Sequence, residues 1–405
     1  MNLRHVTIVY RKEMLDTLRD RRTLISMIVV PLLLMPVLIF GMVALSIKLI
    51  QRARREGAAI MLLGAEHAPR LAARIRGAEG FQVVPPAEDY ARRIEDKKLR
   101  AAIEFPPEFE ERLAAGEEAA DLTVKIYHYQ GEIRSTFAVR NLQKLLRDYR
   151  DEVIEQRLAA RNLSPAILEP FRTEEQNVAS PEKVGGAMLG GLIPYMIILL
   201  SLTGAMYPAI DLTAGEKERG TIETILASPV SRTALATGKF LTVFTASVAT
   251  ALLSLLSLAA TFTFAPQLRE MGGERGRQLF NIALSAKGVA AVLGMILPLA
   301  VMFSAALLAI ALLAKSYKEA QSYISPLMIV VILPAVASIL PGIELDAKLA
   351  LIPILNVSLV SKEILTGTYH WNYIVLIFLS SCVYAAAALG IAAAAFKRES
   401  VLFRT

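Results

Sequence analysis

Residues Phe240–Leu268 read FLTVFTASVATALLSLLSLAATFTFAPQL, a run of 29 residues without a charged side chain. Lys239 precedes the run and Arg269 follows it. An α-helix needs about 20 apolar residues to cross the roughly 30 Å of hydrocarbon in a bilayer. The run is long enough for this, so it predicts a membrane-spanning helix, which we place at 238–264.

Five further runs of 24 to 27 residues also lack charge. They are Leu24–Ile47, Val184–Ile210, Gly288–Ala314, Ala320–Ile343 and Trp371–Phe396. The composition agrees, because 54% of the 405 residues are hydrophobic, whereas soluble domains carry about 45–50%. The sequence therefore predicts an α-helical membrane protein with six transmembrane helices, at 24–47, 184–210, 238–264, 288–314, 320–341 and 371–396.

The Lys and Arg residues of the short loops predict the orientation of these helices. With the N-terminus inside, the cytoplasmic segments hold 15 of them and the short outer loops hold 6. Cytoplasmic loops are enriched in positive charge, so we predict that both termini, including the tail 397–405, lie in the cytoplasm. Residues 349–361 are uncharged but too short to span, and Pro353 interrupts them, which favours a re-entrant or interfacial segment.

The block 48–183 lies between the first two spans and differs sharply in composition. It contains 22 of the 44 Lys and Arg residues, between Arg52 and Lys183. Short apolar runs predict strands, and amphipathic stretches between them predict helices at His67–Arg76, Glu88–Lys97 and Pro107–Ala115. The predicted strands are Ala58–Leu63, Phe81–Val84, Leu99–Phe105 and Leu122–Tyr129. The alternation predicts a large α/β domain, which the orientation places outside the cytoplasm, between helices 1 and 2.

A long helix is predicted at the end of this block, at Ile133–Asn162. One face of it is apolar and carries Leu142, Leu145, Leu146, Tyr149 and Val153. We interpret the helix as a strut packed on the domain, with a partner-binding helix as the alternative.

Several kinds of chemistry are missing from the sequence. Phe240 follows Gly238-Lys239, so the Gly-x-x-x-x-Gly-Lys-[Ser/Thr] motif is absent and the chain cannot bind ATP through a P-loop. The single cysteine, Cys382, excludes a disulfide framework and a cysteine-based zinc site. The spans hold no acidic residue, which counts against a simple cation channel. The net charge of +7 is too scattered for a nucleic-acid-binding surface. We predict no catalytic residue and no metal site.

Residues Asp211–Arg232, DLTAGEKERGTIETILASPVSR, connect the second and third spans. They predict a charged turn followed by a short amphipathic helix at Thr221–Ala227, which Pro229 would end. On the cytoplasmic side, such an element can dock into a groove of another protein. The alternative is a surface helix that lies on the lipid headgroups.

The stretches Glu216–Glu223 and Ser228–Arg232 resemble the loop after the second helix of type-2 ABC exporter permeases. The large outer domain, together with Tyr317–Pro326 and Ile352–Leu359, resembles the NatB-like sodium-efflux branch of that family. The resemblance covers most of the chain and implies that 211–237 is a cytoplasmic coupling loop. The contacts with the ATPase subunit that it implies are made by Glu216, Lys217, Glu218, Arg219, Gly220, Thr221, Glu223, Pro229 and Arg232.

The resemblance also implies the partners of this chain. Two copies of an ABC ATPase subunit would bind ATP and Mg, so this chain itself would hold no cofactor. A second permease copy, identical or related, would complete a dimer in the bacterial cytoplasmic (inner) membrane. Closure of the ATPase subunits would push the coupling loop, and the spans would re-pack around the dimer interface.

The tail 1–23 predicts a basic amphipathic helix in the plane of the membrane surface. Leu3, Val6, Tyr10, Met14 and Leu18 lie near one face of it, with Arg and Lys residues around them. The resemblance implies a connecting helix beside the coupling helix. A plain positively charged anchor is the alternative.

A polar stripe runs along the third span. Its members are spaced three and four residues apart, so they share one helix face. They are Ser247, Thr250, Ser254, Ser257 and Thr261. Small hydroxyl residues allow helices to pack closely in lipid, and we weigh this interpretation against the lining of a substrate path.

These features predict the permease subunit of an ABC exporter, which is a transport subunit and not an enzyme. The resemblance implies sodium or another cation as cargo, whereas an apolar, hydroxyl-lined path would also suit a drug, lipid or peptide amphiphile. The alternative is a membrane receptor or assembly scaffold whose outer domain binds a ligand. A gene for an ATPase with a Walker A motif beside this one would favour the exporter.

Overall fold

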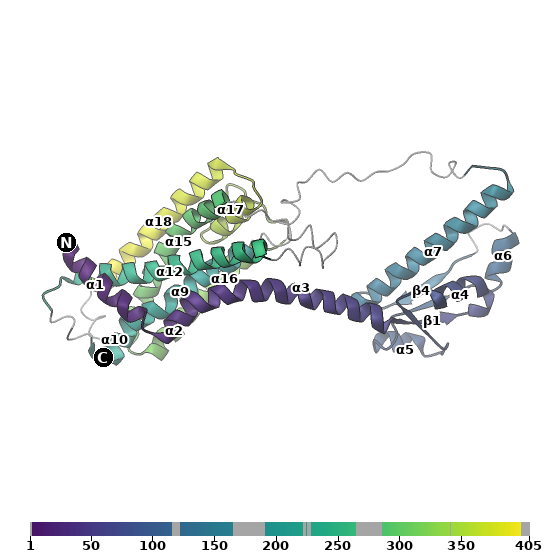
Figure 1. The fold of residues 1–405 in the computed structure, drawn as a ribbon, viewed down its shortest axis with the longest axis horizontal. Helices are drawn as coiled ribbons and strands as arrows, with labels where there is room; N and C mark the ends of the chain where they lie inside the picture. Colours follow the sequence, from purple (N-terminus) through teal and green to yellow (C-terminus); the bar gives the residue numbers. More distant parts are fainter. Residues whose placement is uncertain are drawn as a thin grey trace. The chain divides into compact units, whose positions relative to one another are not determined.

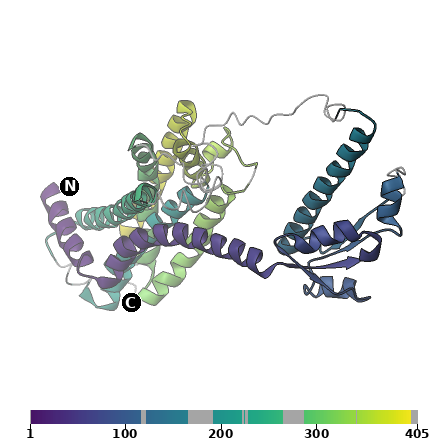
Figure 2. The same cartoon turned by 45° about the vertical axis from the view of Figure 1, so that its right-hand side comes forward.

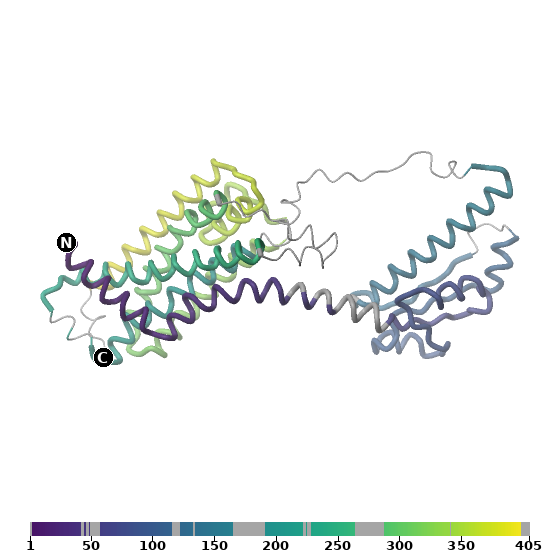
Figure 3. Tube along the Cα trace, in the orientation of Figure 1, coloured from purple at the N-terminus to yellow at the C-terminus, as the bar shows by residue number. Residues whose placement is uncertain are grey.

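A computed structural model describes residues 2–115, 122–164, 191–221, 224, 228–264, 286–340 and 342–397. The chain divides into two compact units, Met1–Val43 with Val178–Thr405, and Ala44–Asn177 (Figure 1). Figure 3 traces the chain through both of them. Each unit is described by itself.

Six helices among the described residues are long and apolar enough to cross a membrane. They cover Arg21–Gly41, Leu192–Glu218, Arg232–Thr263, Lys287–Leu313, Tyr317–Ala337 and Trp371–Lys397. The first unit is therefore mostly helical, with the six apolar spans that the charge-free runs predict.

The first two spans each contain a π-helical turn. The first consists of α2 (Arg21–Leu24), the π-helical η1 (Ile25–Val29) and α3 (Val30–Glu56). The second consists of α9 (Leu192–Ile210), the π-helical η5 (Asp211–Gly215) and α10 (Glu216–Glu218). The other four are α12 (Arg232–Phe264), α15 (Ala286–Leu313), α16 (Tyr317–Ala337) and α18 (Trp371–Lys397). Such turns are frequent at functional positions, and η5 forms the first five residues of the predicted coupling loop 211–237.

The core of this unit lies between α9, α12 and α15, which pack against one another. Leu202, Leu255 and Phe303 are among its fully buried side chains. The short helix α1 (Leu3–Thr17) lies beside α12 (Figure 2). By contrast, α16 and α18 expose large apolar side chains such as Leu333 and Val383, as is typical of helix faces that meet lipid or another membrane subunit.

Two spans extend beyond the charge-free runs, at the two ends that lie on either side of residues 219–231 in the sequence. The third helix begins at Arg232 rather than at 238, and the second continues helically through Asp211 as far as Glu218. These ends contain charged residues such as Glu216 and Lys239, and Lys239 lies beside the charge-free run 240–268. These two charges do not end the helices, because they pair with each other inside the protein, as described below.

The segment predicted as re-entrant or interfacial forms a helix inside the bundle. The 3-10 turn η6 (Leu349–Leu351) leads into α17 (Leu355–Leu365), which packs against α9, α15, α16 and α18. Ile354, between them, has φ 73° and ψ −54°, and the Leu355 N–H donates to the Pro353 carbonyl at 2.9 Å. This hydrogen bond closes a three-residue γ-turn. Its central residue has a positive φ, which is the rare and strained form of the turn. The entry to α17 therefore stores backbone strain at a buried isoleucine.

The second unit contains a four-stranded sheet with the order β2-β1-β3-β4. β1 pairs in parallel with β2 and β3, and β4 pairs antiparallel to β3. The strands are β1 (Ala58–Leu63), β2 (Phe81–Val84), β3 (Ala101–Glu104) and β4 (Lys125–His128). All four lie within the predicted strand ranges. β1 is buried on both faces, because Ile60 and Leu62 belong to one core cluster and Met61 to another.

Helices cover this sheet at the predicted places. They are α4 (Pro69–Gly77), α5 (Tyr90–Glu95), α6 (Phe109–Ala115) and α7 (Ile133–Ala160). Along α7, Leu142 is fully buried, and Leu145, Leu146 and Tyr149 pack against the same cluster as Ile60. α7 is therefore packed on the domain, as in the interpretation of this helix as a strut.

Candidate functional site

The N-terminal helix α1 packs against α12 through a glycine. A Cβ atom on Gly238 would lie 2.5 Å from Val9 Cγ1 and 3.2 Å from the Tyr10 nitrogen. No side chain fits there without a shift, so Gly238 allows the two helices to come this close. The Tyr10 hydroxyl adds a 3.2 Å hydrogen bond to the Thr245 hydroxyl. The contact between α1 and α12 is thus close and partly polar.

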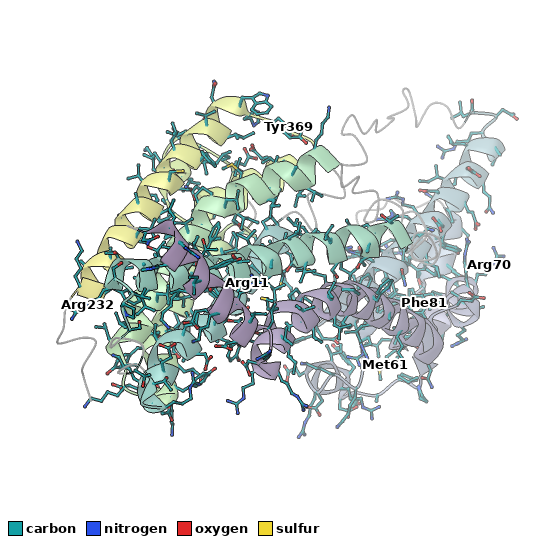
Figure 4. All side chains as sticks on the ribbon, turned by 60° about the vertical axis from the view of Figure 1, so that its left-hand side comes forward. Arg11, Met61, Arg70, Phe81, Arg232 and Tyr369 are labelled. Atoms are coloured by element: carbon teal, nitrogen blue, oxygen red, sulfur yellow. The ribbon has the colours of Figure 1, made fainter. Side chains whose placement is uncertain are left out.

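The face that α1 buries differs from the predicted one. Val6, Val9, Glu13 and Thr17 point inward, whereas Leu3 is 71% exposed. Of the predicted apolar face, Val6 is buried, Tyr10 and Met14 are half-buried, and Leu18 is exposed. The sequence analysis grouped residues by hydrophobicity alone, but a carboxylate takes one of the inward positions. Arg11, labelled in Figure 4, is exposed.

That carboxylate belongs to a buried ion cluster, Glu13, Lys239 and Glu216, which joins three elements. The Lys239 ammonium lies 2.6 Å from Glu216 Oε1 and 3.2 Å from Glu13 Oε1. It also donates to the Leu212 carbonyl at 2.9 Å. The side chains of all three residues are at most 5% exposed. The three N–H groups of Lys239 are used by Glu13 on α1, by Glu216 on α10 and by the Leu212 carbonyl in η5.

The charges around this cluster are nearly balanced. Lys12 Nζ lies 3.2 Å from Glu13 Oε2. Burial acts to lower the pKa of Lys12, but the nearby carboxylates, Glu13 first and then Glu216 and Asp16, together outweigh this, so the pKa of Lys12 is raised above its usual value. In the described part of the chain, Glu216 Oε2 is buried without a hydrogen-bond partner. Removal of one partner from such a cluster typically costs about 3–5 kcal/mol, because an uncompensated charge stays behind.

Three consecutive side chains of the predicted coupling loop bind three different helices. Glu216 pairs with Lys239 on α12, and Lys217 Nζ donates to the Leu312 carbonyl at the end of α15. Glu218 Oε2 accepts the Tyr317 N–H, at the start of α16, at 2.7 Å. A displacement of this turn is therefore transmitted directly to α12, α15 and α16.

The turn ends in a left-handed glycine. Gly220 has φ +69° and open space around the position of a Cβ, and its N–H donates to the Lys217 carbonyl at 3.0 Å. Arg219 Nη1 pairs with Asp211 at 2.8 Å, which ties the turn to η5. The backbone therefore reverses at 220 and leaves Arg219 and its neighbours on the surface.

The predicted contact residues divide into buried and accessible ones. Glu216 is buried and Lys217 is half-buried, so in this structure the Glu216 side chain points at Lys239 on α12 and away from the surface. The accessible ones are Glu218, Arg219, Gly220, Thr221, Pro229 and Arg232. Figure 4 labels Arg232 at the first turn of α12. Glu223 and most of the helix predicted at Thr221–Ala227 lie outside the described residues.

The hydroxyl stripe of α12 is buried within the chain. Ser247 Oγ lies 2.8 Å from Ser201 Oγ on α9, and Ser257 Oγ donates to the Leu32 carbonyl of the first span at 2.8 Å. Thr250 Oγ1 donates to the Met27 carbonyl at 3.3 Å.

The other two members, Ser254 and Thr261, donate to carbonyls of α12 itself. A Cβ on Gly204 would lie 2.1 Å from Thr250 Oγ1, so α9 and α12 nearly touch. Packing accounts for these contacts, and a role in a substrate path stays a prediction.

Sequence reasoning missed Glu13 and Lys239. A signal for Glu13 was present, because it continues the spacing of Val6 and Val9 along the buried face of α1. Gly238-Lys239 was considered only as an incomplete P-loop. Within the described ranges, no group of three or more His, Cys, Asp or Glu residues is placed to hold a metal ion.

Comparison with known proteins gives the family of the chain. The model of the ABC-2 family transporter protein matches residues 21–394. The chain is 29% identical over 361 residues to the ABC transporter permease protein NatB of Bacillus subtilis (strain 168), with 89% of each chain covered. No solved structure matches. The chain belongs to the ABC-2 transporter family and is the membrane permease subunit of an ABC exporter, not an enzyme.

Proposed function

We propose that a separate ABC ATPase subunit drives this permease by contacting the accessible edge of its coupling loop. That edge comprises Glu218–Thr221, Pro229 and Arg232, and the family resemblance adds Glu223 as a further contact residue. One observation supports this proposal above the others: Glu216, Lys217 and Glu218 bind α12, α15 and α16 in turn. A force on the exposed side of this turn would therefore reach three spans at once.

The arrangement of the complex follows from this proposal. Two ATPase subunits, each with ATP and Mg, would serve two permease chains, as a homodimer or a related heterodimer in the bacterial inner membrane. The segments 1–23, 211–237 and 397–405 would lie in the cytoplasm. The block 48–183 would lie outside it, and 349–361 would enter the membrane from the outer side.

We propose sodium or another small cation as the cargo, on the basis of the sequence relationship to the NatB-like branch. In the described part of a single chain, the hydroxyl stripe is buried against α9 and the first span. A path along it would therefore need these helices to separate, or would have to form between two permease copies. Transport of a drug, lipid or peptide amphiphile is the competing result of the experiment below.

The experiment reconstitutes the permease in liposomes with an ABC ATPase subunit from the same organism. We expect ATP-dependent movement of radioactive sodium out of the compartment that faces the permease's N-terminus. A variant ATPase without its Walker A lysine should abolish this movement. If the two proteins form a complex that moves a fluorescent amphiphile but no sodium, the cargo proposal is wrong. If they form no complex, the coupling proposal is wrong.

A further inference from the structure

The ion cluster Glu13, Lys239 and Glu216 links α1 to the coupling loop. Among the described residues, the Lys239 ammonium contacts two carboxylates, that of Glu13 on α1 and that of Glu216 on α10. The Leu212 carbonyl takes the third N–H. Lys239 therefore bridges two elements that lie far apart in the sequence.

The link is strong because it is buried. An exposed ion pair contributes little, since water and salt screen it, whereas charges out of water attract each other at a lower effective dielectric constant. Separation of α1 from Lys239 would leave a carboxylate without its partner in a site only a few per cent exposed. The close approach at Gly238 adds van der Waals contact to the ionic link. α1 should therefore move together with the turn Glu216–Gly220 of the coupling loop.

The cluster also has a spare acceptor. Lys239 contacts Glu216 through Oε1, while Oε2 is buried without a partner among the described residues. Rotation of the Glu216 carboxylate could bring Oε2 to the Lys239 ammonium in place of Oε1. The ion pair can thus persist through a displacement of α10 and need not break.

We propose that Lys239 and Glu13 are positioning residues that make α1 a moving part of the coupling element. This inference rests on the proposed function. When the ATPase subunits close on the exposed edge of the loop, the cluster pulls α1 along with the turn. The outer face of α1, which exposes Ile8 and Leu15 beside Arg11, then shifts at the membrane surface.

The experiment follows the accessibility of α1 in the complex with the ATPase. A Cys382→Ala background removes the only native cysteine, and Ile8→Cys, at a position 58% exposed, reports on α1. The rate of maleimide labelling is measured without nucleotide and with ATP and vanadate. We expect a several-fold difference between the two states.

The decisive variant is Glu13→Met, which cuts the link to α1 but leaves Lys239 and Glu216 as a balanced pair. It should bind the ATPase normally but lose the nucleotide-dependent change in labelling. The neutral variant Glu13→Gln/Lys239→Met/Glu216→Gln should also lose the nucleotide-dependent change in labelling. It replaces Glu13→Met in the experiment if Glu13→Met does not fold.

The matched control is Arg74→Met, which breaks an exposed 2.6 Å ion pair with Glu152 in the other unit and should keep the change. A Glu13→Met protein whose labelling still responds to nucleotide overturns the inference. So does a parent protein whose labelling never responds, even though it binds the ATPase and stimulates hydrolysis. Failure of the proposed function is a different result, in which no complex forms.

Discussion

Oε1 of Glu216 lies 2.6 Å from Nζ of Lys239, although 23 positions separate the two residues in the sequence. Glu216 stands at the end of the second span, and Lys239 lies in the third turn of α12. The pair therefore fixes both ends of the segment that joins these spans. A loop anchored in this way transmits force to the bundle, whereas one attached by flexible chain at either end would absorb it.

The first prediction separates two roles of Glu218. Its carboxylate accepts the Tyr317 N–H at 2.7 Å, and a glutamine could accept the same bond through its carbonyl oxygen. If Glu218 acts only by holding α16, Glu218→Gln should couple like the parent protein and Glu218→Lys should not. If its charge also contacts the ATPase, both variants should lose affinity, by about 1–3 kcal/mol for the loss of a charge-assisted bond. Titration of the ATPase onto the permease in nanodiscs measures this difference.

The second prediction concerns the close contact of α9 with α12. A Cβ on Gly204 would lie 2.1 Å from Thr250 Oγ1, while one on Gly294 in α15 meets no atom within 4 Å. Gly204→Ala should lower the free energy of unfolding by about 1–3 kcal/mol through overpacking. Gly294→Ala should raise it by about 0.5–1 kcal/mol through the better helix former. Unfolding in mixed micelles compares the two, and equal effects would contradict the close packing.

The third prediction tests the hydroxyl stripe. Ser254 Oγ donates to the Thr250 carbonyl of its own helix, whereas Ser257 Oγ donates to the Leu32 carbonyl of another span. Ser254→Ala should therefore be nearly silent, and Ser257→Ala should cost about 0.6 kcal/mol or somewhat more. Ser254→Leu should be damaging, because the site is fully buried.

Transport assays add a second readout for the stripe. A Ser254→Ala variant with normal stability that changes which compounds stimulate ATP hydrolysis would favour the pathway interpretation over packing.

The fourth prediction uses the strained turn at Ile354. Both Ile354→Ala and Ile354→Gly remove a buried side chain, which costs about 2–5 kcal/mol. Only glycine adopts φ 73° without strain, so the glycine variant should be the more stable by about 1 kcal/mol. At most positions an alanine variant is more stable than a glycine variant, so the order expected here is the reverse of the usual one. An alanine variant as stable as the glycine variant would show that the turn is not strained.

Local signals in the sequence were enough for the elements. β1 and β2 have the predicted limits because a short apolar run between turn residues carries its own secondary-structure signal. The six spans could be predicted because hydrophobic length decides them. The strand order β2-β1-β3-β4 could not, since it depends on pairings that no single segment encodes.

The ion cluster could not be predicted for the same reason. Glu13 and Lys239 are 226 positions apart. The spacing of Val6, Val9 and Glu13 marks one face of α1, but nothing in either segment indicates that the two charges meet. A charge beside an apolar run is usually taken as the limit of a span. Here its partner comes from another helix, so the charge is buried and the helix continues through it.

The most direct test of the coupling account compares two glycines in the same backbone conformation. Gly220 has φ +69° in the coupling loop and Gly342 has φ +84° in a segment predicted to lie outside, and both have open space around them. Proline cannot adopt a positive φ and has no N–H.

The measurement is binding of the ATPase subunit and stimulation of its ATP hydrolysis by each proline variant in nanodiscs. Both Gly220→Pro and Gly342→Pro should insert into the membrane. We expect Gly220→Pro to lose binding or stimulation and Gly342→Pro to keep both. A Gly220→Pro permease that binds the ATPase and stimulates hydrolysis like the parent protein would show that this loop is not the coupling element.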